Sequence, residues 1–287
     1  MADKKLWESL PPLSETLKAN GLFANKKLGQ HFLLDRNITD KIARLAMPLK
    51  GYSVAEIGPG PGGLTRSLID SGADTVLAIE MDERFVKMGE DITPLCEGRL
   101  TMLQSDALKV DITDHLAAPI KIVANLPYNV GTKMLINWMS AKPLFWVQMV
   151  LMFQKEVADR ITAQPGENAY GRLAILCQSV ASCHQAFDLP ARAFTPPPKV
   201  DSAVVVLEPL AAPFKDLKTL GELTASCFGQ RRKMLRASLK SFARKYDLDL
   251  LEWLEQCGID PKARPETLPV SAFQRLTEDV KANSNFS

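Results

Sequence analysis

Short apolar runs separated by helix signals occupy the chain up to about residue 208. The runs predict strands at residues 53–57, 75–80, 100–106, 120–125 and 146–153, with two later strands at 182–189 and 203–207. The run at 146–153 is nearly continuous, which is typical of a strand buried on both faces. Strands and helices that alternate at these lengths predict an α/β fold with a mostly parallel sheet covered by helices.

Helices are predicted between these strands and also before them. They begin near Leu64, at Asp82 and at residue 154. Upstream, residues 14–21 suit a short helix that Gly21 would end. The segment KKLGQHFLL (26–34) is interpreted as a loop that leads into a helix, which Asp35 would cap.

The pattern changes after the last predicted strand. The segment EPLAAPF (208–214) contains two prolines and ends the strand pattern, so we interpret it as a linker. From Leu217 onward the apolar spacing is helical, and no strand pattern appears. We therefore expect an N-terminal extension (1–25), a large α/β domain (26–209) and a small all-helical domain (210–287).

Composition excludes several classes of protein. The 287 residues are 46% hydrophobic and 24% charged, as in an ordinary globular protein. The five cysteines form no CxxC pair and the three histidines lie far apart, so neither a disulfide framework nor a metal site is indicated. Residues 1–12 lack the apolar core of a signal peptide, and the longest apolar run is too short to cross a membrane. We expect a cytoplasmic protein that binds no metal.

Three glycines follow the first predicted strand of the sheet. Gly58, Gly60 and Gly63 fit the pattern G-x-G-x-x-G between a strand and a helix, which is typical of nucleotide sites in general. Pro59 and Pro61 each remove a backbone N–H donor that a pyrophosphate would need. The loop therefore favours a nucleotide ligand without a pyrophosphate.

Two carboxylates end the next two predicted strands. Glu80 can accept hydrogen bonds from ribose hydroxyls, and Asp106 can accept one from an adenine amine. Either residue alone could merely cap the following helix. Together, at successive strand ends beside a glycine loop, they indicate a site for adenosine.

The fourth predicted strand runs into Asn125, Leu126, Pro127 and Tyr128. An adenine N6 amine is a poor nucleophile because its lone pair is delocalised into the ring. The Asn125 side-chain oxygen and the Leu126 carbonyl could accept its hydrogens and free that lone pair, and Tyr128 could stack on the base. Such chemistry needs positioning and electrostatics and requires no metal. The alternative is that residues 125–128 form a proline-containing turn with only a structural role.

Nine segments of the chain resemble one known family in the same order. They are KKLGQHFL (26–33), EIGPGPGGLT (56–65), IEMD (79–82), QSDAL (104–108), NLPYN (125–129), QKEVADR (154–160), YGRL (170–173), FTPPPKVDSAVV (194–205) and FGQRRKMLRASL (228–239). Over roughly residues 15–280 the chain resembles the KsgA/RsmA-type 16S (small-subunit) rRNA dimethyladenosine transferases.

This resemblance implies a Rossmann-like sheet that binds S-adenosyl-L-methionine (SAM). It implies SAM-dependent N6-dimethylation of two adjacent adenosines near the 3′ end of 16S rRNA, late in small-subunit assembly. The expected partner is 16S rRNA within an immature small ribosomal subunit, and the expected state is a monomer.

The resemblance also implies roles for individual residues. The cofactor would contact His31, Leu33, Gly58, Glu80, Asp106 and Asn125. Phe194 would be a second aromatic face for the target base. His31 stands where many relatives have asparagine, so its backbone contact is the safer inference.

Three other functions fit part of the pattern. A large-subunit rRNA adenine methyltransferase of the antibiotic-resistance type shares the glycine loop and the turn at Asn125, but FTPPPKVDS with FGQRRK favours the small-subunit family. An NAD-dependent oxidoreductase would also have the glycine loop, but its chemistry would leave the turn at Asn125 without a function. A non-catalytic assembly factor would not need an intact site.

Seven basic residues and no acidic one lie between residues 231 and 245. They are Arg231, Arg232, Lys233, Arg236, Lys240, Arg244 and Lys245. Four of them recur every fourth residue, which predicts one stripe along a single helix. A run of basic residues can be a merely solvated face, but here we expect it to bind RNA phosphates.

Overall fold

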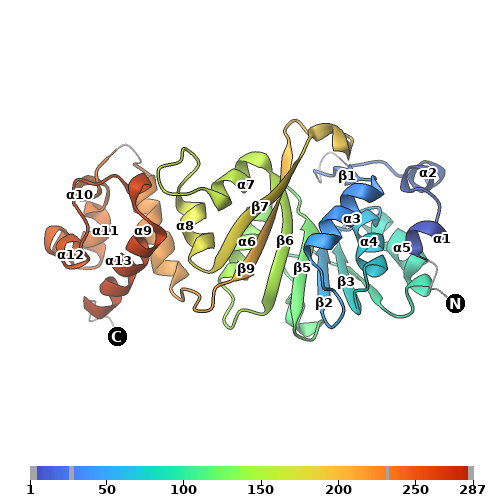
Figure 1. The fold of residues 1–287 in the computed structure, drawn as a ribbon, viewed down its shortest axis with the longest axis horizontal. Coiled ribbons are helices and arrows are strands. Elements are labelled where there is room, and N and C mark those ends of the chain that lie inside the picture. The colour runs from blue at the N-terminus through green and yellow to red at the C-terminus, as the bar shows by residue number, and fades with distance from the viewer. Residues whose placement is uncertain (1–4, 26–28, 231–232, 284–287) are drawn as a thin grey trace. The chain divides into compact units, whose positions relative to one another are not determined.

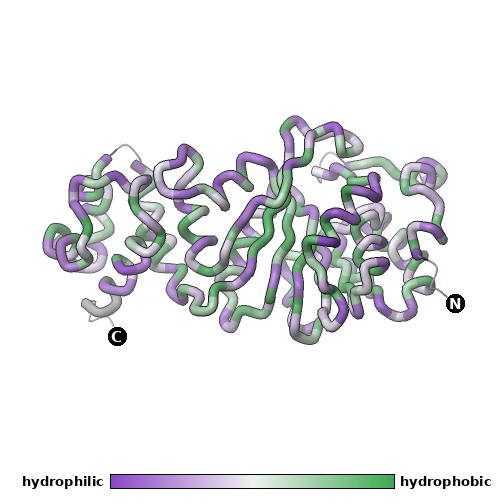
Figure 2. The backbone as a smooth tube through the Cα atoms, in the orientation of Figure 1, coloured by the Kyte–Doolittle hydropathy of each residue, from purple (hydrophilic) through white to green (hydrophobic). Residues whose placement is uncertain are grey.

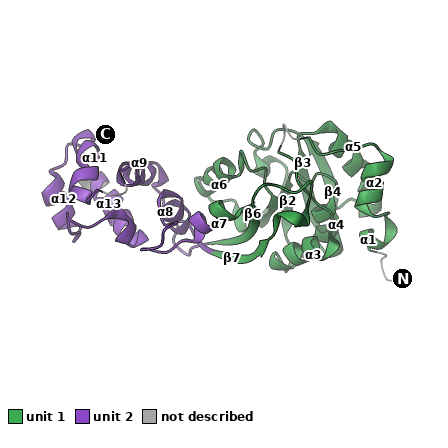
Figure 3. Cartoon of the chain, turned by 90° about the horizontal axis from the view of Figure 1, so that it is seen from above, with its two compact units in different colours: residues 1–158, 184–208 green, residues 159–183, 209–287 purple. Residues whose placement is uncertain are grey.

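A computed structural model describes residues 5–25, 29–230 and 233–283. The chain forms two compact units, which Figure 3 colours separately: residues 1–158 with 184–208, and residues 159–183 with 209–287. The sequence analysis assigned residues 159–183 to the α/β domain. In the structure this segment groups with the C-terminal helices, because α8 (Arg172–Gln178) packs against α9 (Leu217–Phe228) and α13 (Val270–Asn283).

The first unit is built on a central sheet that has seven strands among the described residues. In spatial order they are β4 (Leu100–Gln104), β3 (Thr75–Glu80), β2 (Ser53–Ile57), β5 (Ile120–Asn125), β6 (Trp146–Gln154), β9 (Ser202–Pro209) and β7 (Ala181–Leu189). The pairs from β4 through β6 are parallel, and β9 runs antiparallel to β6. The prediction of a mostly parallel sheet is confirmed.

The strand order places the carboxyl ends of β3, β2 and β5 side by side. Residue Ile57 of β2 is paired with Ile79 of β3 and with Ala124 of β5. The chain order reverses between β2 and β5, since β3 and β4 lie on one side of β2 and β5 lies on the other. In open parallel sheets a ligand binds at such a switch point, beyond the carboxyl ends of the strands.

Continuous apolar runs form the central strands because both faces of the sheet are covered. Within the run predicted to be buried at 146–153, residues 149–153 are all buried, whereas Val147 near its start is exposed. Figure 2 shows the central strands as mostly hydrophobic. In Figures 1 and 3, α3 (Arg36–Leu45) and α4 (Gly63–Asp70) lie on one face of the sheet and α6 (Gly131–Met139) lies on the other. The predicted α/β class with helices on both faces is therefore confirmed.

Two of the predicted helix starts are confirmed by side-chain caps. The Asp35 side chain accepts a hydrogen bond from the Asn37 backbone N–H and begins α3. Asp82 does the same for α5 (Glu83–Ile92) through the backbone N–H of Arg84. Each cap satisfies a donor that the first helical turn leaves without a partner.

Two short helices precede the sheet, α1 (Leu6–Ser9) and α2 (Leu13–Ala19). The backbone N–H groups of Leu6 and Trp7 donate to the Asp70 carboxylate at the end of α4. Leu6 and Leu13 are buried. The N-terminal segment is therefore packed against the first unit and helps to hold α4 in place.

Two strands of two residues each form a separate small sheet. β1 (Phe32–Leu33) pairs with β8 (Phe194–Thr195) in antiparallel register. This pairing joins the segment around residue 31 to the segment after residue 193. Four 3₁₀ helices complete the described elements of the chain: Thr93–Cys96, Ile112–Asp114, Ala191–Ala193 and Pro265–Thr267.

Among its described residues, the second unit contains helices and no strand beyond the first residues of β7 and the last residue of β9. Besides α8, α9 and α13, its described helices are α10 (Leu235–Ser238), α11 (Lys240–Lys245) and α12 (Leu250–Gln256), and it also receives the end of α7 (Lys155–Thr162). Phe242 of α11 stacks on Trp253 of α12, with ring centroids 5.7 Å apart. The prediction of an all-helical C-terminal region is confirmed.

Within the described ranges, no helix is long and apolar enough to cross a membrane. The five cysteines are free thiols.

Candidate active site

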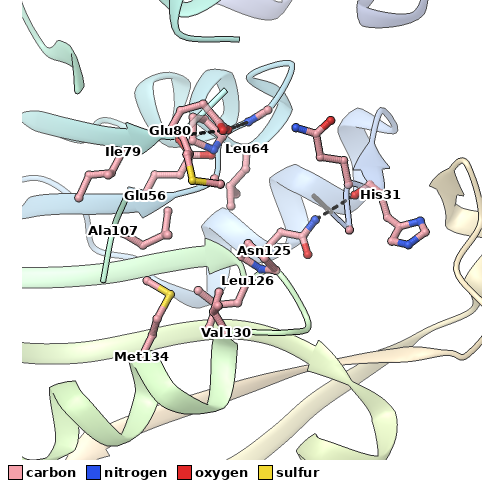
Figure 4. Close-up of a pocket in the computed structure, with 18 of the residues that line it drawn as sticks. His31, Glu56, Leu64, Ile79, Glu80, Ala107, Asn125, Leu126, Val130 and Met134 are labelled. Carbon is pink, nitrogen blue, oxygen red and sulfur yellow. Dashed lines mark hydrogen bonds between the residues drawn. The ribbon is translucent and has the colours of Figure 1, made fainter. Parts of the chain in front are cut away.

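A pocket lies at the carboxyl ends of β2, β3 and β5 in the first unit (Figure 4). Its lining comes from the segment before β1, the glycine loop after β2, and the turns after β3, β4 and β5. The residues singled out from the sequence that line it are His31, Leu33, Gly58, Pro59, Gly60, Pro61, Gly63, Glu80, Asp106, Asn125, Leu126, Pro127 and Tyr128. The fold thus brings the two predicted sites, for adenosine and for the target amine, into one cavity.

The glycine loop is shaped by left-handed backbone and by close neighbours. Gly60 has φ +51°, and a Cβ atom there would meet the Phe32 ring at 3.3 Å. A Cβ on Gly63 would lie 2.7 Å from the Leu33 carbonyl oxygen, closer than real contacts allow. Larger residues would therefore push the loop and the 32–33 segment apart, and the open cradle depends on glycine here.

Glu80 ends β3 and is buried beside the loop. Its Oε2 accepts a hydrogen bond from the Gly60 N–H at 3.1 Å, and its Oε1 accepts from Met81 and Asp82. Burial raises the pKa of Glu80, and the three backbone N–H groups oppose that shift. Because Oε1 already accepts two bonds, Oε2 is the oxygen with an acceptor position left for a ligand hydroxyl.

Asp106 follows β4 and also lines the pocket. Its Oδ1 accepts a hydrogen bond from the Leu108 N–H at 3.0 Å, which fixes the turn. Oδ2 has no hydrogen-bond partner in the described part of the chain. That oxygen is the acceptor that an exocyclic amine of adenine requires.

Glu56 is a pocket residue to which the sequence analysis gave no role. It lies on β2, is 1% exposed, and its Oε2 has no hydrogen-bond partner among the described residues. Burial raises the pKa of Glu56 to about 8; the neighbouring Thr65 lowers it, and the Glu80 charge raises it further. Near neutral pH the Glu56 carboxyl is therefore largely protonated in the protein without ligand.

Asn125 is held in one orientation by the segment on the other side of the pocket. Its Nδ2 donates a hydrogen bond to the His31 carbonyl oxygen at 3.3 Å, which Figure 4 marks as a dashed line. The amide oxygen, Oδ1, has no partner within the described residues. Asn125 therefore offers an acceptor at the centre of the pocket, as the predicted chemistry requires.

Tyr128 has contacts from two distant segments. Its phenol shares a hydrogen bond of 2.7 Å with the hydroxyl of Ser202. Its ring is stacked with that of His31, with centroids 5.8 Å apart and an interplanar angle of 26°. Burial raises the pKa of Tyr128, and the Ser202 contact opposes that shift. The sequence analysis did not single out Ser202, although it lies in the segment FTPPPKVDSAVV.

Phe194 does not lie where its predicted role requires. Its side chain is 3% exposed and belongs to the main hydrophobic cluster of the first unit. Its backbone pairs with Leu33 in the two-stranded sheet. A ring that is packed into the core has no face free for a base, so this placement does not support the stacking role.

The basic run does not form the single helix that the sequence predicted. The helix is interrupted at Leu239, so Arg236 lies on α10 while Lys240 and Arg244 lie on α11. Arg231 and Arg232 lie outside the described residues. Lys245 does have an acidic partner, since it pairs with Glu222 of α9.

The remaining basic side chains of the run are exposed. Lys233, Arg236, Lys240 and Arg244 all lie at the surface of the second unit. No ion pair holds these four in the part of the chain that the structure describes. They are therefore available to an anionic partner.

The description "Ribosomal RNA adenine dimethylase" belongs to a family model that matches residues 21–281. The chain belongs to this family. It is 50% identical over 279 residues to ribosomal RNA small subunit methyltransferase A of Maricaulis maris (strain MCS10), with 96% of each chain covered. It is 51% identical to the protein of the same name from Cereibacter sphaeroides (strain ATCC 17025 / ATH 2.4.3), covering 95% of this chain and 98% of that one.

Solved structures agree with this membership of the adenine dimethylase family. A dimethyladenosine transferase from Plasmodium falciparum has a TM-score of 0.76 and 28% identity, with 88% of this chain and 98% of that chain covered. The 23S rRNA methyltransferase ErmE has a TM-score of 0.66 and 26% identity, with 87% and 99% covered. The family and the fold imply the use of SAM, and the interpretation as an NAD-dependent oxidoreductase is not supported.

Proposed function

We propose that this protein transfers methyl groups from SAM to the N6 amines of two adjacent adenosines near the 3′ end of small-subunit (16S) rRNA. The observation that carries the proposal is the convergence of two sets of residues in one pocket. Glu80 and Asp106 offer acceptors that suit an adenosine, and Asn125 offers an acceptor that suits an amine. The similarity to small-subunit methyltransferases along nearly the whole chain supports the choice of RNA.

The residues present fit SAM as the bound cofactor. The glycine loop forms a cradle that a Cβ atom would fill, and two carboxylates stand at the ends of adjacent strands beside it. Glu80 Oε2 would hold the ribose, Asp106 Oδ2 would hold the adenine amine, and Gly58 would lie against the methionine part. When bound, SAM supplies an electrophilic methyl group on a sulfonium.

The residues of the turn after β5 would prepare the target amine. Asn125 Oδ1 and the Leu126 carbonyl would accept the two N6 hydrogens, which favours a pyramidal nitrogen with a free lone pair. Tyr128 would stack on the base after it leaves its helix. Because the acceptors are fixed before the substrate arrives, they stabilise the transition state without reorganisation.

The exposed basic residues of the second unit suit an RNA partner. Lys233, Arg236, Lys240 and Arg244 would contact phosphates, which carry affinity rather than sequence specificity. The proposal includes action in the cytoplasm, as a monomer, on an immature small subunit.

A second candidate is methylation of large-subunit rRNA. The likeness to ErmE favours it, because that protein shares 26% identity along most of the chain. The roughly 50% identity to small-subunit methyltransferases favours the first proposal more strongly.

An assay with methyl-labelled SAM separates the two candidates. Small subunits and large-subunit rRNA, both taken from cells that lack the modifications, are offered separately to the wild-type protein. We expect label in the small-subunit RNA and none above background in the large-subunit RNA. Label in the large-subunit RNA alone would contradict the proposed function.

A further inference from the structure

The segment FTPPPKVDSAVV contributes a buried hydroxyl to the active site. Ser202 begins β9 and its side chain is fully buried, yet its hydroxyl lies 2.7 Å from the Tyr128 phenol oxygen. These two residues are 74 positions apart in the chain. The contact is partly buried and joins two segments that are far apart in the chain, so it limits where the phenol oxygen lies.

His31 contacts three parts of the same site. Its ring stacks on Tyr128, its backbone carbonyl accepts the hydrogen bond from Asn125 Nδ2, and its Nδ1 lies 2.8 Å from the Pro196 carbonyl oxygen. A carbonyl can only accept, so Nδ1 carries the proton in that last contact. Pro196 belongs to the same segment as Ser202. The two segments therefore restrain both the ring and the amide that face the pocket.

These contacts bear directly on the proposed function. An amide presents either its oxygen or its nitrogen, and only the oxygen can accept a hydrogen of the target amine. Because the His31 carbonyl accepts from Nδ2, the Asn125 side chain is kept from flipping. The phenol contact and the ring stack likewise limit rotation of Tyr128. Small errors in the placement of such groups lower rates strongly.

On the basis of the proposed function, we propose that His31 and Ser202 are positioning residues, which hold Asn125 and Tyr128 in the orientation that receives the target adenine. The contrasting interpretation is that the same contacts only stabilise the fold. A purely structural contact would change the melting temperature and leave the rate of the folded enzyme unchanged. A positioning contact lowers the rate while SAM affinity stays the same.

A double-mutant cycle on Ser202→Ala and Tyr128→Phe tests the hydrogen bond between Ser202 and Tyr128. Each change removes the same hydrogen bond and keeps the backbone and the aromatic ring. Single-turnover methyl transfer to small subunits should be slower by roughly five- to tenfold in each variant. The double variant should be no slower than the slower single variant, since the bond can be lost only once. The SAM dissociation constant, from calorimetry, should stay within about twofold.

Ser179→Ala is the matched control for this cycle. Ser179 is as fully buried as Ser202, but its hydroxyl has no hydrogen-bond partner among the described residues. It lies outside the pocket, so the rate should equal that of the wild type. Melting temperatures of all variants identify any loss that comes from unfolding.

His31→Ala and His31→Phe test the ring contact between His31 and Tyr128. Both keep the backbone carbonyl that Asn125 uses, and only His31→Phe keeps an aromatic ring against Tyr128. We expect His31→Ala to be slower by roughly tenfold and His31→Phe to recover part of that loss. Wild-type rates in His31→Ala would overturn the proposal that the His31 ring positions Tyr128.

The proposal for Ser202 would be overturned if Ser202→Ala transferred methyl groups at the wild-type rate. It would also be overturned if the rate reduction in the double variant equalled the product of the reductions in the two single variants. A wild-type protein that methylates large-subunit RNA instead would contradict the proposed substrate, and the same cycle on that RNA would still test the positioning role. A wild-type protein that methylates neither RNA would overturn both.

Discussion

At the scale of single residues, the pocket carboxyl groups of Glu80 and Glu56 differ in their hydrogen bonds. Glu80 accepts three backbone hydrogen bonds, which oppose the rise in its pKa that burial causes. Glu56 has one oxygen without a hydrogen-bond partner among the described residues, and its pKa is raised to about 8. An unpaired charge in such a place would be costly, so Glu56 keeps its proton instead. Protein stability should therefore depend on pH through this residue.

Glu56→Gln should flatten that dependence. Between its ordinary pKa of 4.5 and about 8, Glu56 holds a proton in the folded protein and releases it on unfolding. The folded state thus binds more protons, so stability is greatest below this window and falls as pH rises through it, by up to about 1.4 kcal/mol per pH unit. Glutamine cannot ionise and removes this contribution. Urea unfolding measured from about pH 5 to 8 would contradict the assignment if both proteins gave parallel curves.

Glu80→Ala should weaken the binding of SAM. The sequence suggested bonds from both ribose hydroxyls, but Oε1 is already used, so one bond to Oε2 is the minimum loss. A hydrogen bond to a charged group contributes roughly 1.5–3 kcal/mol, which predicts about a 10- to 150-fold loss of affinity.

Glu83→Ala is the control for this prediction, because Glu83 is an exposed acid in the same segment that does not line the pocket. Calorimetry that gives equal SAM affinity for Glu80→Ala, Glu83→Ala and the wild type would exclude Glu80 from the site.

The positions of pocket residues at strand ends could be predicted from the sequence. Glu80, Asp106 and Asn125 follow apolar runs directly, and parallel strands bring their carboxyl ends together. Contacts between distant segments could not be predicted in this way. The Ser202 contact needs the register of β6 with β9, and the burial of Phe194 follows from the pairing of β8 with β1.

At the scale of elements, strands were predicted better than the helices of the second unit. Residues 53–57, 75–80 and 120–125 form strands with the predicted bounds, because each is a short apolar run closed by a turn. β1 and β8 were not predicted, since two residues carry no periodic pattern. The basic run was predicted as one helix because its four-residue spacing is regular, but the chain turns at Leu239.

The basic residues that remain on α10 and α11 give a prediction for RNA binding. Arg236→Ala with Lys240→Ala should weaken binding to small-subunit rRNA and flatten its dependence on salt. The slope of log affinity against log salt should fall by roughly 0.7–0.9 for each phosphate contact that is lost. SAM affinity should not change, because all residues that line the pocket belong to the first unit.

Lys50→Ala with Lys87→Ala removes the same charge from exposed positions of the first unit and serves as the control. An unchanged salt slope in the Arg236/Lys240 variant would show that these side chains are only solvated.

At the scale of the whole molecule, the division into two units was only partly visible in the sequence. The prolines at residues 209 and 213 mark the boundary where the second unit resumes. Residues 159–183 join that unit through packing of α8 on α9 and through the hydrogen bond from Tyr170 to the Leu268 carbonyl. Neither contact leaves a local pattern, so the sequence alone assigned the segment to its neighbours along the chain.

The central claim is that one pocket holds both the methyl donor and the target adenine of small-subunit rRNA. The most direct test is to map methyl groups by mass spectrometry, after nuclease digestion of small subunits that were treated with the protein and SAM. We expect two adjacent N6,N6-dimethyladenosines near the 3′ end of the RNA with the wild type. With Asn125→Ala, which should bind SAM within a few fold, transfer should fall by orders of magnitude. Methyl groups elsewhere, or equal methylation by Asn125→Ala, would contradict the account.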